Sequence, residues 1–183
     1  MWSDLTEVKK RTIDDLESLW RTTTKDIAAH SAYSGLNLSP QLGLVPLGPD
    51  PKSGLHEFAH LQSGDVPKRG VDGRLQLTEE TGIVLVLVPG GSFTMGAMKP
   101  SETAPLGSPN VDPETKKSEG PPHNVKLEPF FMGKYELTQG QWQRFTKDNP
   151  AAYAPGRIIG GNTHDARHPV EQIGWKDTSL VLE

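Results

Sequence analysis

The longest uninterrupted apolar run in the chain is only six residues, Ile83–Val88. Glycine and proline interrupt the sequence throughout: 19 glycines and 16 prolines occur in 183 residues, above their usual combined share of roughly 12%. Both residues favour turns, so the regular elements between them must be short. A run of six apolar residues is also too short to cross a bilayer. We therefore expect short strands and many turns, and no membrane-spanning segment.

Charge and cysteine content narrow the functional classes further. The formal net charge is −4, so the composition does not predict the basic face that nucleic-acid binding requires. The sequence has no cysteine, which excludes disulfides, thiolate metal sites and a cysteine nucleophile within it. The start, MWSDLTEVKK, mixes acids and bases without the apolar core of an export signal. We expect a cytoplasmic protein that binds neither nucleic acid nor membrane, and whose other partners are unknown.

Residues 4–29 have the spacing of an amphipathic helix. Its stripe recurs every three or four residues and consists of Leu5, Val8, Thr12, Leu16, Leu19 and Ile27, widened by Ile13 and Trp20. Ser3 or Asp4 is suited to cap the first turn. We expect the stripe to pack on a neighbouring domain, because Trp2 and Trp20 would otherwise form an exposed apolar surface. A coiled-coil partner is the alternative.

Residues 34–81 change to short apolar segments separated by turn signals. We predict about four short strands in and just after this region, near 43–47, 55–61, 74–77 and 83–88. Asp72-Gly73 has the composition of a tight hairpin turn. This part of the chain therefore predicts a small β segment.

One pattern within these strands has a second interpretation. His56-Glu57-Phe58-Ala59-His60 matches H-E-x-x-H, in which two histidines one helical turn apart hold zinc and the glutamate activates water. Glu79 or Glu80 is the candidate third ligand. However, Gly54 and Gly64 leave room for only a short segment, and its residues also alternate as in a strand, with Glu57 on one face and both histidines on the other. A strand is our preferred interpretation, and a zinc metalloprotease using His56 and His60 is the third functional hypothesis.

Two further patterns suggest ligand binding less strongly. His164, Asp165 and His168 offer imidazole and carboxylate groups to a metal, but Gly160-Gly161 and Pro169 around them favour a polar surface loop. Gly91–Gly96 begins like a phosphate-binding loop, yet Ala97 stands where that motif requires lysine. We therefore assign no metal, cofactor or nucleotide site to these residues.

Four blocks follow one another in the second half of the chain. They are Pro-Gly-Gly-Ser-Phe-Thr-Met-Gly at 89–96, Glu119 to Val125 with His123, Tyr135-Glu136-Leu137-Thr138, and His168 to Asp177 with Trp175. We expect the first block to form a hairpin in which residues 92–96 run back along the buried strand 83–88. We expect a helix to begin at Gln139 after a capping box, to place Trp142 and Phe145 on one face, and to end at Asn149-Pro150.

This order of blocks resembles the opening part of the formylglycine-generating enzyme, or sulfatase-modifying factor, family over residues 80–177. The resemblance implies an irregular α+β fold of the C-type-lectin type. It also implies that His123 begins a structural strand, Glu136 supports the core, Trp175 fills the core, and Asp177 begins a helix. Residues 34–81 resemble, more loosely, the segment before such domains in some large bacterial proteins, several of them fused to kinases.

We accordingly expect three parts. Residues 1–30 form an amphipathic helix, residues 31–80 a Gly/Pro-rich segment of short strands, and residues 81–183 the N-terminal part of a sulfatase-modifying-factor domain. The fold is thus expected to be incomplete, because the sequence ends at Glu183, where such a domain is less than half built. Half of a domain exposes apolar surface, so we also expect marginal stability.

The family's chemistry has no counterpart in these residues. In active members, a pair of cysteines in the later half binds copper and oxidises a target cysteine to formylglycine; bound calcium and a closing Arg-Gly-Gly-Ser-Trp block lie there too. The resemblance therefore assigns no catalytic, cofactor-binding or metal-binding residue here. We expect a truncated, non-catalytic domain whose parent activity is oxidation of a protein cysteine, or a related oxidation. The alternative is a lectin-like binding module of a multidomain bacterial protein.

Overall fold

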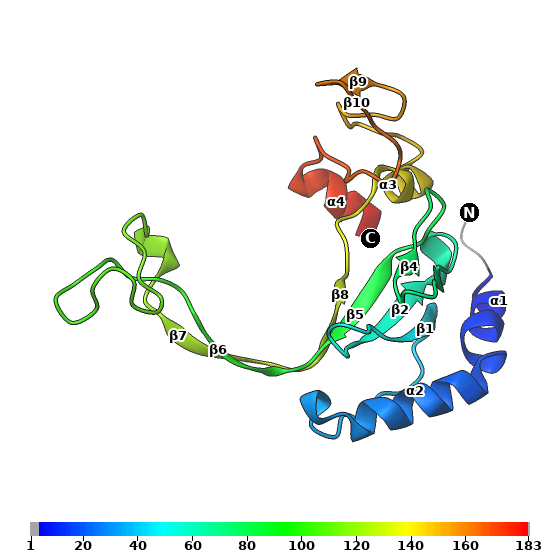
Figure 1. Cartoon of the computed structure of the whole chain (residues 1–183), viewed down its shortest axis with the longest axis horizontal. Coiled ribbons are helices and arrows are strands. Elements are labelled where there is room, and N and C mark those ends of the chain that lie inside the picture. The colour runs from blue at the N-terminus through cyan, green and yellow to red at the C-terminus, as the bar shows by residue number, and fades with distance from the viewer. Residues whose placement is uncertain (1–3, 183) are drawn as a thin grey trace. The chain divides into compact units, whose positions relative to one another are not determined.

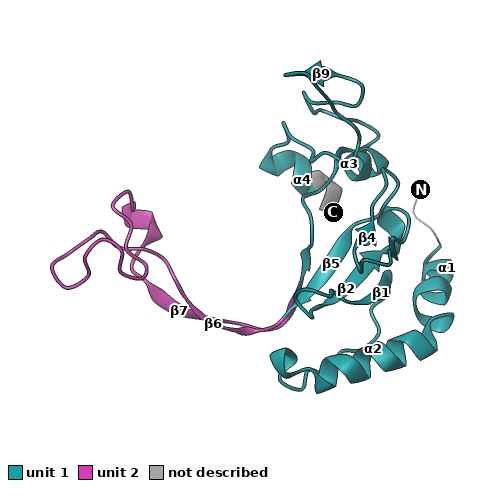
Figure 2. Ribbon diagram, viewed as in Figure 1, with its two compact units in different colours: residues 1–88, 131–183 teal, residues 89–130 magenta. Residues whose placement is uncertain are grey.

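The computed structural model describes residues 4–182, which divide into two units (Figures 1 and 2). Unit 1 comprises residues 1–88 and 131–183, and unit 2 comprises residues 89–130. Trp2, Ser3 and Glu183 lie outside the described residues. The helical elements are α1 (Leu5–Lys9), the π-helix η1 (Lys10–Asp14), α2 (Glu17–Ala29), the 3-10 helices η2 (Ser31–Tyr33), η3 (Leu61–Ser63) and η4 (Lys117–Glu119), α3 (Gln139–Thr146) and α4 (Trp175–Leu182).

The strands are short, as the spacing of glycine and proline predicts. They are β1 (Leu44–Pro49), β2 (His56–His60), β3 (Lys68–Arg69), β4 (Leu75–Gln76), β5 (Val84–Val88), β6 (Gly91–Met95), β7 (His123–Leu127), β8 (Phe130–Gly133), β9 (Ile158–Ile159) and β10 (Asn162–Thr163). One sheet has the order β1-β2-β5-β8, and the other three sheets have two strands each. The fold is therefore a mixture of helices and small sheets, whose assigned strand pairs are antiparallel.

The strand predictions for residues 43–88 are confirmed. β1, β2, β4 and β5 fall at the four predicted places, and β3, which was not predicted, pairs with β4. The turn between them includes Asp72-Gly73, and Gly73 has a φ of 76°, which a glycine adopts without strain. β2 is a strand and not a zinc-binding helix, as its alternating pattern indicates.

The core of unit 1 lies between α2 and the four-stranded sheet. Trp20 of α2 is 1% exposed and stacks on Phe58 of β2, with ring centroids 5.7 Å apart. Phe131 of β8 meets Phe58 edge to face at 5.2 Å. The indole N–H of Trp20 donates to the carbonyl of Thr12, so its polar atom is satisfied. The N-terminal helix thus packs on the following strands, as expected.

The helix predicted over residues 4–29 is confirmed in outline, with differences in detail. Asp4 caps it by accepting from the N–H of Thr6. The helix changes to π geometry at η1 and has a turn between Asp14 and Glu17. This break rotates the buried face, so that Leu5 and Leu19 are exposed while Thr23 is buried. A strict periodic stripe does not anticipate such a rotation.

The predicted hairpin between residues 83–88 and 92–96 is wrong. β5 lies between β2 and β8, whereas β6 pairs with β7 in unit 2, with Phe93 opposite Val125. Gly90 explains part of the difference: an added Cβ there would lie 2.6 Å from the carbonyl oxygen of Leu127. Gly90 therefore allows the segment around Leu127 to approach its backbone closely, and residues 89–91 do not form a local hairpin turn. β7 does begin at His123, as the family resemblance implies.

The predicted starts of the two C-terminal helices, α3 and α4, lie within two residues of the observed starts, whereas α3 ends earlier than predicted. α3 begins at Gln139 with the predicted capping box, in which the hydroxyl of Thr138 accepts from the N–H of Gln141. It ends at Thr146, before Asn149-Pro150, because Lys147 adopts a left-handed φ of 65°. α4 begins at Trp175, two residues before Asp177. Among residues 4–182, no helix combines the length and apolar character needed to traverse a bilayer.

Candidate functional site

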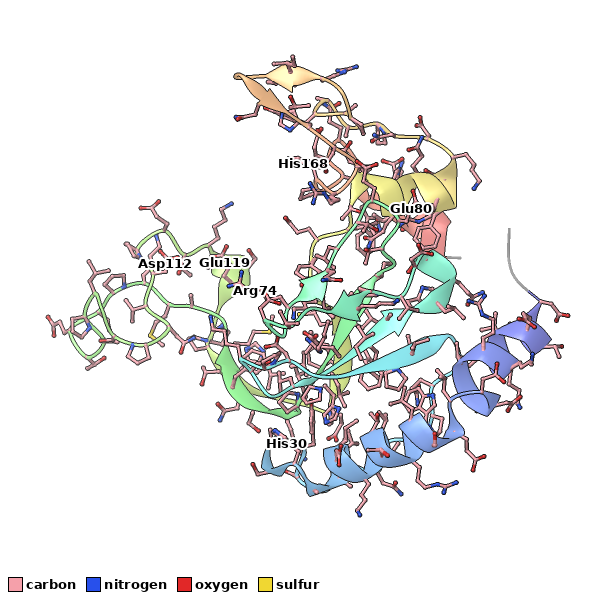
Figure 3. The ribbon with its side chains drawn as sticks, turned by 45° about the vertical axis from the view of Figure 1, so that its right-hand side comes forward. His30, Arg74, Glu80, Asp112, Glu119 and His168 are labelled. Atoms are coloured by element: carbon pink, nitrogen blue, oxygen red, sulfur yellow. The ribbon has the colours of Figure 1, made fainter. Side chains whose placement is uncertain are left out.

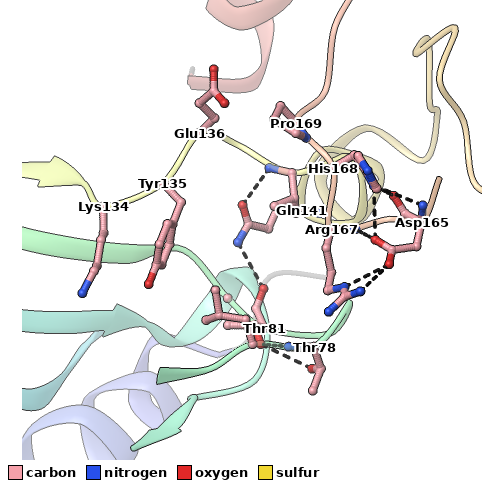
Figure 4. A pocket seen from close by; sticks show the side chains of 13 residues that line it. Thr78, Thr81, Lys134, Tyr135, Glu136, Gln141, Asp165, Arg167, His168 and Pro169 are labelled. Atoms are coloured by element: carbon pink, nitrogen blue, oxygen red, sulfur yellow. Dashed lines mark hydrogen bonds and ion pairs between the residues drawn. The ribbon is translucent and has the colours of Figure 1, made fainter. Parts of the chain in front are cut away.

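Unit 1 contains a cavity of about 650 Å³. Three segments surround it: residues 77–82, residues 134–141 and residues 165–169 (Figure 4). The lining residues are Leu77, Thr78, Thr81, Gly82, Lys134, Tyr135, Glu136, Thr138, Gln141, Asp165, Arg167, His168 and Pro169. A volume of this size suits a drug-sized ligand or a few side chains of a polypeptide.

Helix α3 holds the first of these segments. Arg144 donates to three carbonyl oxygens: Nε to Ser63 at 2.7 Å, Nη1 to Glu79 at 3.0 Å and Nη2 to Thr81 at 2.9 Å. Gln141 also donates its Nε2 to Thr81, at 3.1 Å. A planar guanidinium presents several donors in fixed directions, so one side chain can fix three points of a loop. Residues 77–82 therefore form a preorganised wall.

The loop at residues 165–169 forms a second wall and is fixed by an ion pair. Arg167 donates from Nε at 3.0 Å and from Nη2 at 2.6 Å to one carboxylate oxygen of Asp165. The hydrogen-bonded side chain of Arg167 lowers the pKa of Asp165 to about 2. The N–H of Gln139 donates to the carbonyl of His168, which ties the loop to α3. Figure 4 shows Arg167 turned to Asp165 at the cavity.

The third wall begins at Lys134, whose charge is neutralised by two carboxylates from the N-terminal part of the chain. Its Nζ donates to Glu57 and, at 3.1 Å, to Asp50. Burial acts to lower the pKa of Lys134, but the hydrogen bonds to these two carboxylates outweigh it and hold the pKa above its ordinary value. The backbone N–H of Ser53, and then Lys134, hold the pKa of Asp50 well below its usual range.

Glu57 is the centre of this charge cluster. Its side chain is 1% exposed and also accepts from Arg69 at 2.6 Å. Arg69 additionally donates to the carbonyls of Leu47, Gly48 and Gly73, so it ties β1 and the β3–β4 turn to β2. A buried carboxylate with two cationic partners is satisfied, and it fixes the position of Lys134 at the cavity.

These contacts engage several of the polar groups that line the cavity. Lys134 and Arg167 are each engaged by carboxylates, and Thr81 Oγ1 accepts from the N–H of Thr78. None of the described lining residues combines a nucleophile with a hydrogen-bonded base, which covalent catalysis requires. The remaining surface presents Tyr135, Leu77 and Pro169 next to amide and hydroxyl groups. This combination of apolar area and fixed polar groups is typical of a ligand-binding or active site.

The residues of the H-E-x-x-H pattern do not form a zinc site. His56 and His60 lie four residues apart on β2, a separation of about 13 Å along a strand, so one ion cannot contact both. Glu57 faces Lys134 and Arg69 instead, and Glu79 and Glu80 follow in the segment held by Arg144. This geometry removes the basis of the zinc metalloprotease hypothesis.

The other candidate residues are also separated or occupied. Residues 164–168 lie in a loop, as predicted; within it, His164 and His168 meet edge to face at 4.9 Å, and Asp165 is paired with Arg167. Over residues 4–182, no three His, Cys, Asp or Glu side chains are grouped so that they would hold a metal ion. His123 is exposed and contacts the carbonyl of Pro121.

Two residues that the family resemblance assigns to the core are on the surface. Glu136 is exposed, because the chain bends at Lys134 and Tyr135 as it leaves β8. Trp175 is 87% exposed at the start of α4. In contrast, Trp142 is 4% exposed, as its place in α3 predicts.

Sequence patterns did not identify the cavity or the charge cluster. Glu57 was considered only within the H-E-x-x-H pattern, and no sequence pattern singled out Lys134. One signal was present: a glutamate in the middle of a short strand whose neighbours are apolar must find a cationic partner. The identity of that partner, 77 residues away, depends on the tertiary fold.

Comparison with known proteins agrees with the order of the sequence blocks. Residues 74–180, more than half of the chain, match the sulfatase-modifying factor enzyme 1-like domain. The chain is 32% identical over 93 residues to a protein named "Chaperone protein LppX" from Paenibacillus barcinonensis, which covers 51% of this chain and 22% of that protein. The chain thus spans only part of the length of this curated relative. No solved structure matches the chain.

The matched residues include α3, the 165–169 loop and Lys134, and indeed every residue that lines the cavity. Residues 4–73, which supply α2, β1, β2 and Glu57, precede the match. The chain belongs to the sulfatase-modifying factor enzyme 1-like family, of which it contains part of the domain.

Proposed function

We propose that these residues bind a polypeptide segment at the cavity of unit 1 and do not themselves oxidise it. The observation that carries this proposal is the cavity, whose walls are fixed by Arg144, by the Asp165–Arg167 pair and by the Glu57–Lys134 contact. Of its charged lining groups, Lys134, Asp165 and Arg167 are neutralised in place, whereas Glu136 is exposed and has no ion pair among the described residues. This lining suits recognition of a segment that is uncharged or carries a positive charge. The name of the relative, a chaperone, is consistent with a polypeptide ligand.

Oxidation by the family's copper chemistry does not fit these residues. Cu(I) is held by soft thiolate ligands, and the sequence has no cysteine. Histidine and carboxylate groups do not replace them, since among residues 4–182 no three of them gather at one point. If the protein to which these residues belong converts cysteine to formylglycine, the thiolates come from other residues. In that case this part of the domain contributes binding and support.

The finer features of the fold belong to the same proposal. We propose that the mixture of helices and small sheets is the irregular C-type-lectin-like fold of the family. We also retain the division into an amphipathic helix at 1–30, a short-strand segment at 31–80 and the family domain from 81. The family match begins at residue 74, close to the last of these boundaries, although β2 and β5 pair across it.

A binding measurement tests the proposal directly. The probe is a fluorescein-labelled peptide of alternating threonine and valine with one central cysteine and a lysine at each end. We expect its fluorescence anisotropy to rise on addition of the protein. Leu77→Trp fills the cavity that Leu77 lines and should weaken binding by about tenfold, a loss of about 1.4 kcal/mol.

Leu106→Trp is the matched control, because Leu106 is 69% exposed in unit 2 and does not line the cavity. Equal affinity of the Leu77→Trp variant and the native protein would remove the cavity from the proposal. Mass spectrometry of the same peptide, after incubation with copper and oxygen and subsequent reduction of disulfides, should show no conversion of the cysteine to formylglycine. Formation of the aldehyde would overturn the non-catalytic assignment.

A further inference from the structure

The two edges of the four-stranded sheet differ in their protection. β1 at one edge contains Pro46 and Pro49, and its register with β2 shifts between Pro46 and Gly48. Proline lacks an N–H, and a bulge disrupts the ladder, so both features oppose the addition of another strand. β8 at the other edge, Phe-Phe-Met-Gly, has no proline within it. Edge protection is therefore present on one side and lacking on the other.

The outer side of β8 has backbone groups available for pairing. The N–H of Lys134 donates to the carbonyl of Val84 at 2.8 Å, so the backbone of Lys134 faces β5. Backbone direction alternates along a strand, which turns the N–H and C=O groups of Gly133 and Phe131 away from β5. The sheet ends at β8, and within the described part of the chain no strand pairs with this outer side.

This edge is accessible to a ligand. Met132 is 54% exposed, and Gly133 is exposed as well. Figure 1 shows β8 on the outer side of β5. Phe131 is held against Phe58, so the edge strand is anchored through the core and would not need to reorganise when another strand pairs with it.

The edge also leads directly to the cavity. β8 ends at Gly133, and the next three residues, Lys134, Tyr135 and Glu136, line the cavity. A polypeptide laid along Phe131–Gly133 therefore reaches the cavity within a few residues, where Tyr135 and Leu77 can contact its side chain. One segment would occupy both features at once.

We propose that the partner is an extended, proline-free polypeptide segment that pairs with β8 as a fifth strand of the sheet. This inference rests on the polypeptide binding proposed above and specifies how the segment is held. Main-chain hydrogen bonds to Phe131 and Gly133 supply affinity without regard to sequence, and the cavity supplies selectivity for the side chain that enters it.

A backbone-directed variant tests strand addition. Gly133→Pro removes the outward N–H of Gly133 without removing a hydrogen bond to β5, whereas Gly133→Ala keeps the N–H. The peptide described above should bind the proline variant about tenfold more weakly than the alanine variant, which carries a side chain at the same place and is the reference; this is the loss expected for one or two hydrogen bonds. Thermal unfolding of both variants verifies that they are folded.

Two further measurements do not depend on the folding of a variant. In the native protein, peptide addition should slow amide hydrogen exchange at Gly133 and leave the exchange at His123 of unit 2 unchanged. A peptide with N-methyl groups on two adjacent central residues lacks donors on both of its edges, and should bind about tenfold more weakly.

The outcomes separate the two proposals. Suppose that the peptide binds and that Leu77→Trp weakens its binding, but that the peptide does not slow hydrogen exchange at Gly133 and that N-methylation does not weaken binding. In that case strand addition is wrong, and polypeptide binding at the cavity stands. If the native protein binds no peptide in any assay, both proposals are wrong. Slowed exchange at Gly133 together with weaker binding of the methylated peptide supports strand addition.

Discussion

At the scale of single residues, Glu57 is the most constrained group in unit 1. Its carboxylate lies on a short strand with both faces buried and is contacted by Arg69 and Lys134. Removing one partner of a buried ion pair leaves the other charge without compensation, which costs more than the intact pair contributes. The position therefore responds strongly to a change that preserves size and shape.

Glu57→Gln tests this directly. Because Arg69 and Lys134 retain about a fifth of their exposure, we expect the free energy of unfolding to fall by about 3 kcal/mol, the lower end of the range for breaking buried pairs. Glu17→Gln is the matched control, since the Glu17–Arg21 pair is more than three-quarters exposed and should contribute less than about 0.5 kcal/mol. Urea titration of both variants gives the comparison. Similar losses in the two would mean that Glu57 is effectively solvated.

His56 provides a prediction on pH. It is 3% exposed, and its Nδ1 has no hydrogen-bond partner within the described residues. Burial lowers its pKa, Asp26 acts to raise it, and His30, which follows α2 (Figure 3), acts to lower it. Burial also lowers the pKa of His60. The folded protein thus binds fewer protons than the unfolded chain, so stability is complete above the ordinary histidine pKa of 6.5 and declines as the pH falls below it.

We expect the urea concentration at the unfolding midpoint to decrease as the pH is lowered from about 6.5 to 5. This pH dependence should be weaker in a His56→Asn, His60→Asn double variant. His123→Asn, at an exposed histidine of unit 2, should leave the pH dependence unchanged. A midpoint that stays constant over this range in the native protein would show that neither buried histidine resists protonation.

At the scale of elements, α3 organises the segment that forms one cavity wall. Arg144 binds three carbonyls between residues 63 and 81, so Arg144→Met should destabilise the fold by about 2–3 kcal/mol and raise hydrogen exchange in that segment. Arg21→Met, which removes only an exposed pair on α2, is the control. Unchanged exchange at residues 63–81 would show that the segment is held by Gln141 and packing instead.

Local patterns predicted the elements better than their partners. The capping box at Thr138, the strand β2 and the turn at Gly73 depend on neighbours a few residues away, and all three are confirmed, although β2 is buried on both faces. The pairing of β5 with β2 and β8 depends on segments far apart in sequence, and the local hairpin predicted for it is wrong. The cavity could not be predicted for the same reason, because its walls come from three separated segments.

At the scale of the whole molecule, residues before the family match are part of its core. The expectation of marginal stability assumed that the strand at 83–88 and the aromatic residues after it would lack partners. In the structure, Val84 and Leu87 are buried and Phe131 packs on Phe58, because β1, β2 and α2 cover them. Trp175 does remain exposed. Unit 2 is held by the β6–β7 pairing, with Asp112 and Glu119 in its long connection (Figure 3).

The strand order β1-β2-β5-β8 also determines when each part of the sheet can form during synthesis on the ribosome. Trp20 and Phe58 emerge early, whereas Phe131, which completes their aromatic cluster, is added only after the whole of unit 2 has been translated. Contacts between residues so distant along the chain form slowly, since a long loop must close first. A nascent chain therefore carries Trp20 and Phe58 without Phe131 until the last strand of the sheet leaves the exit tunnel.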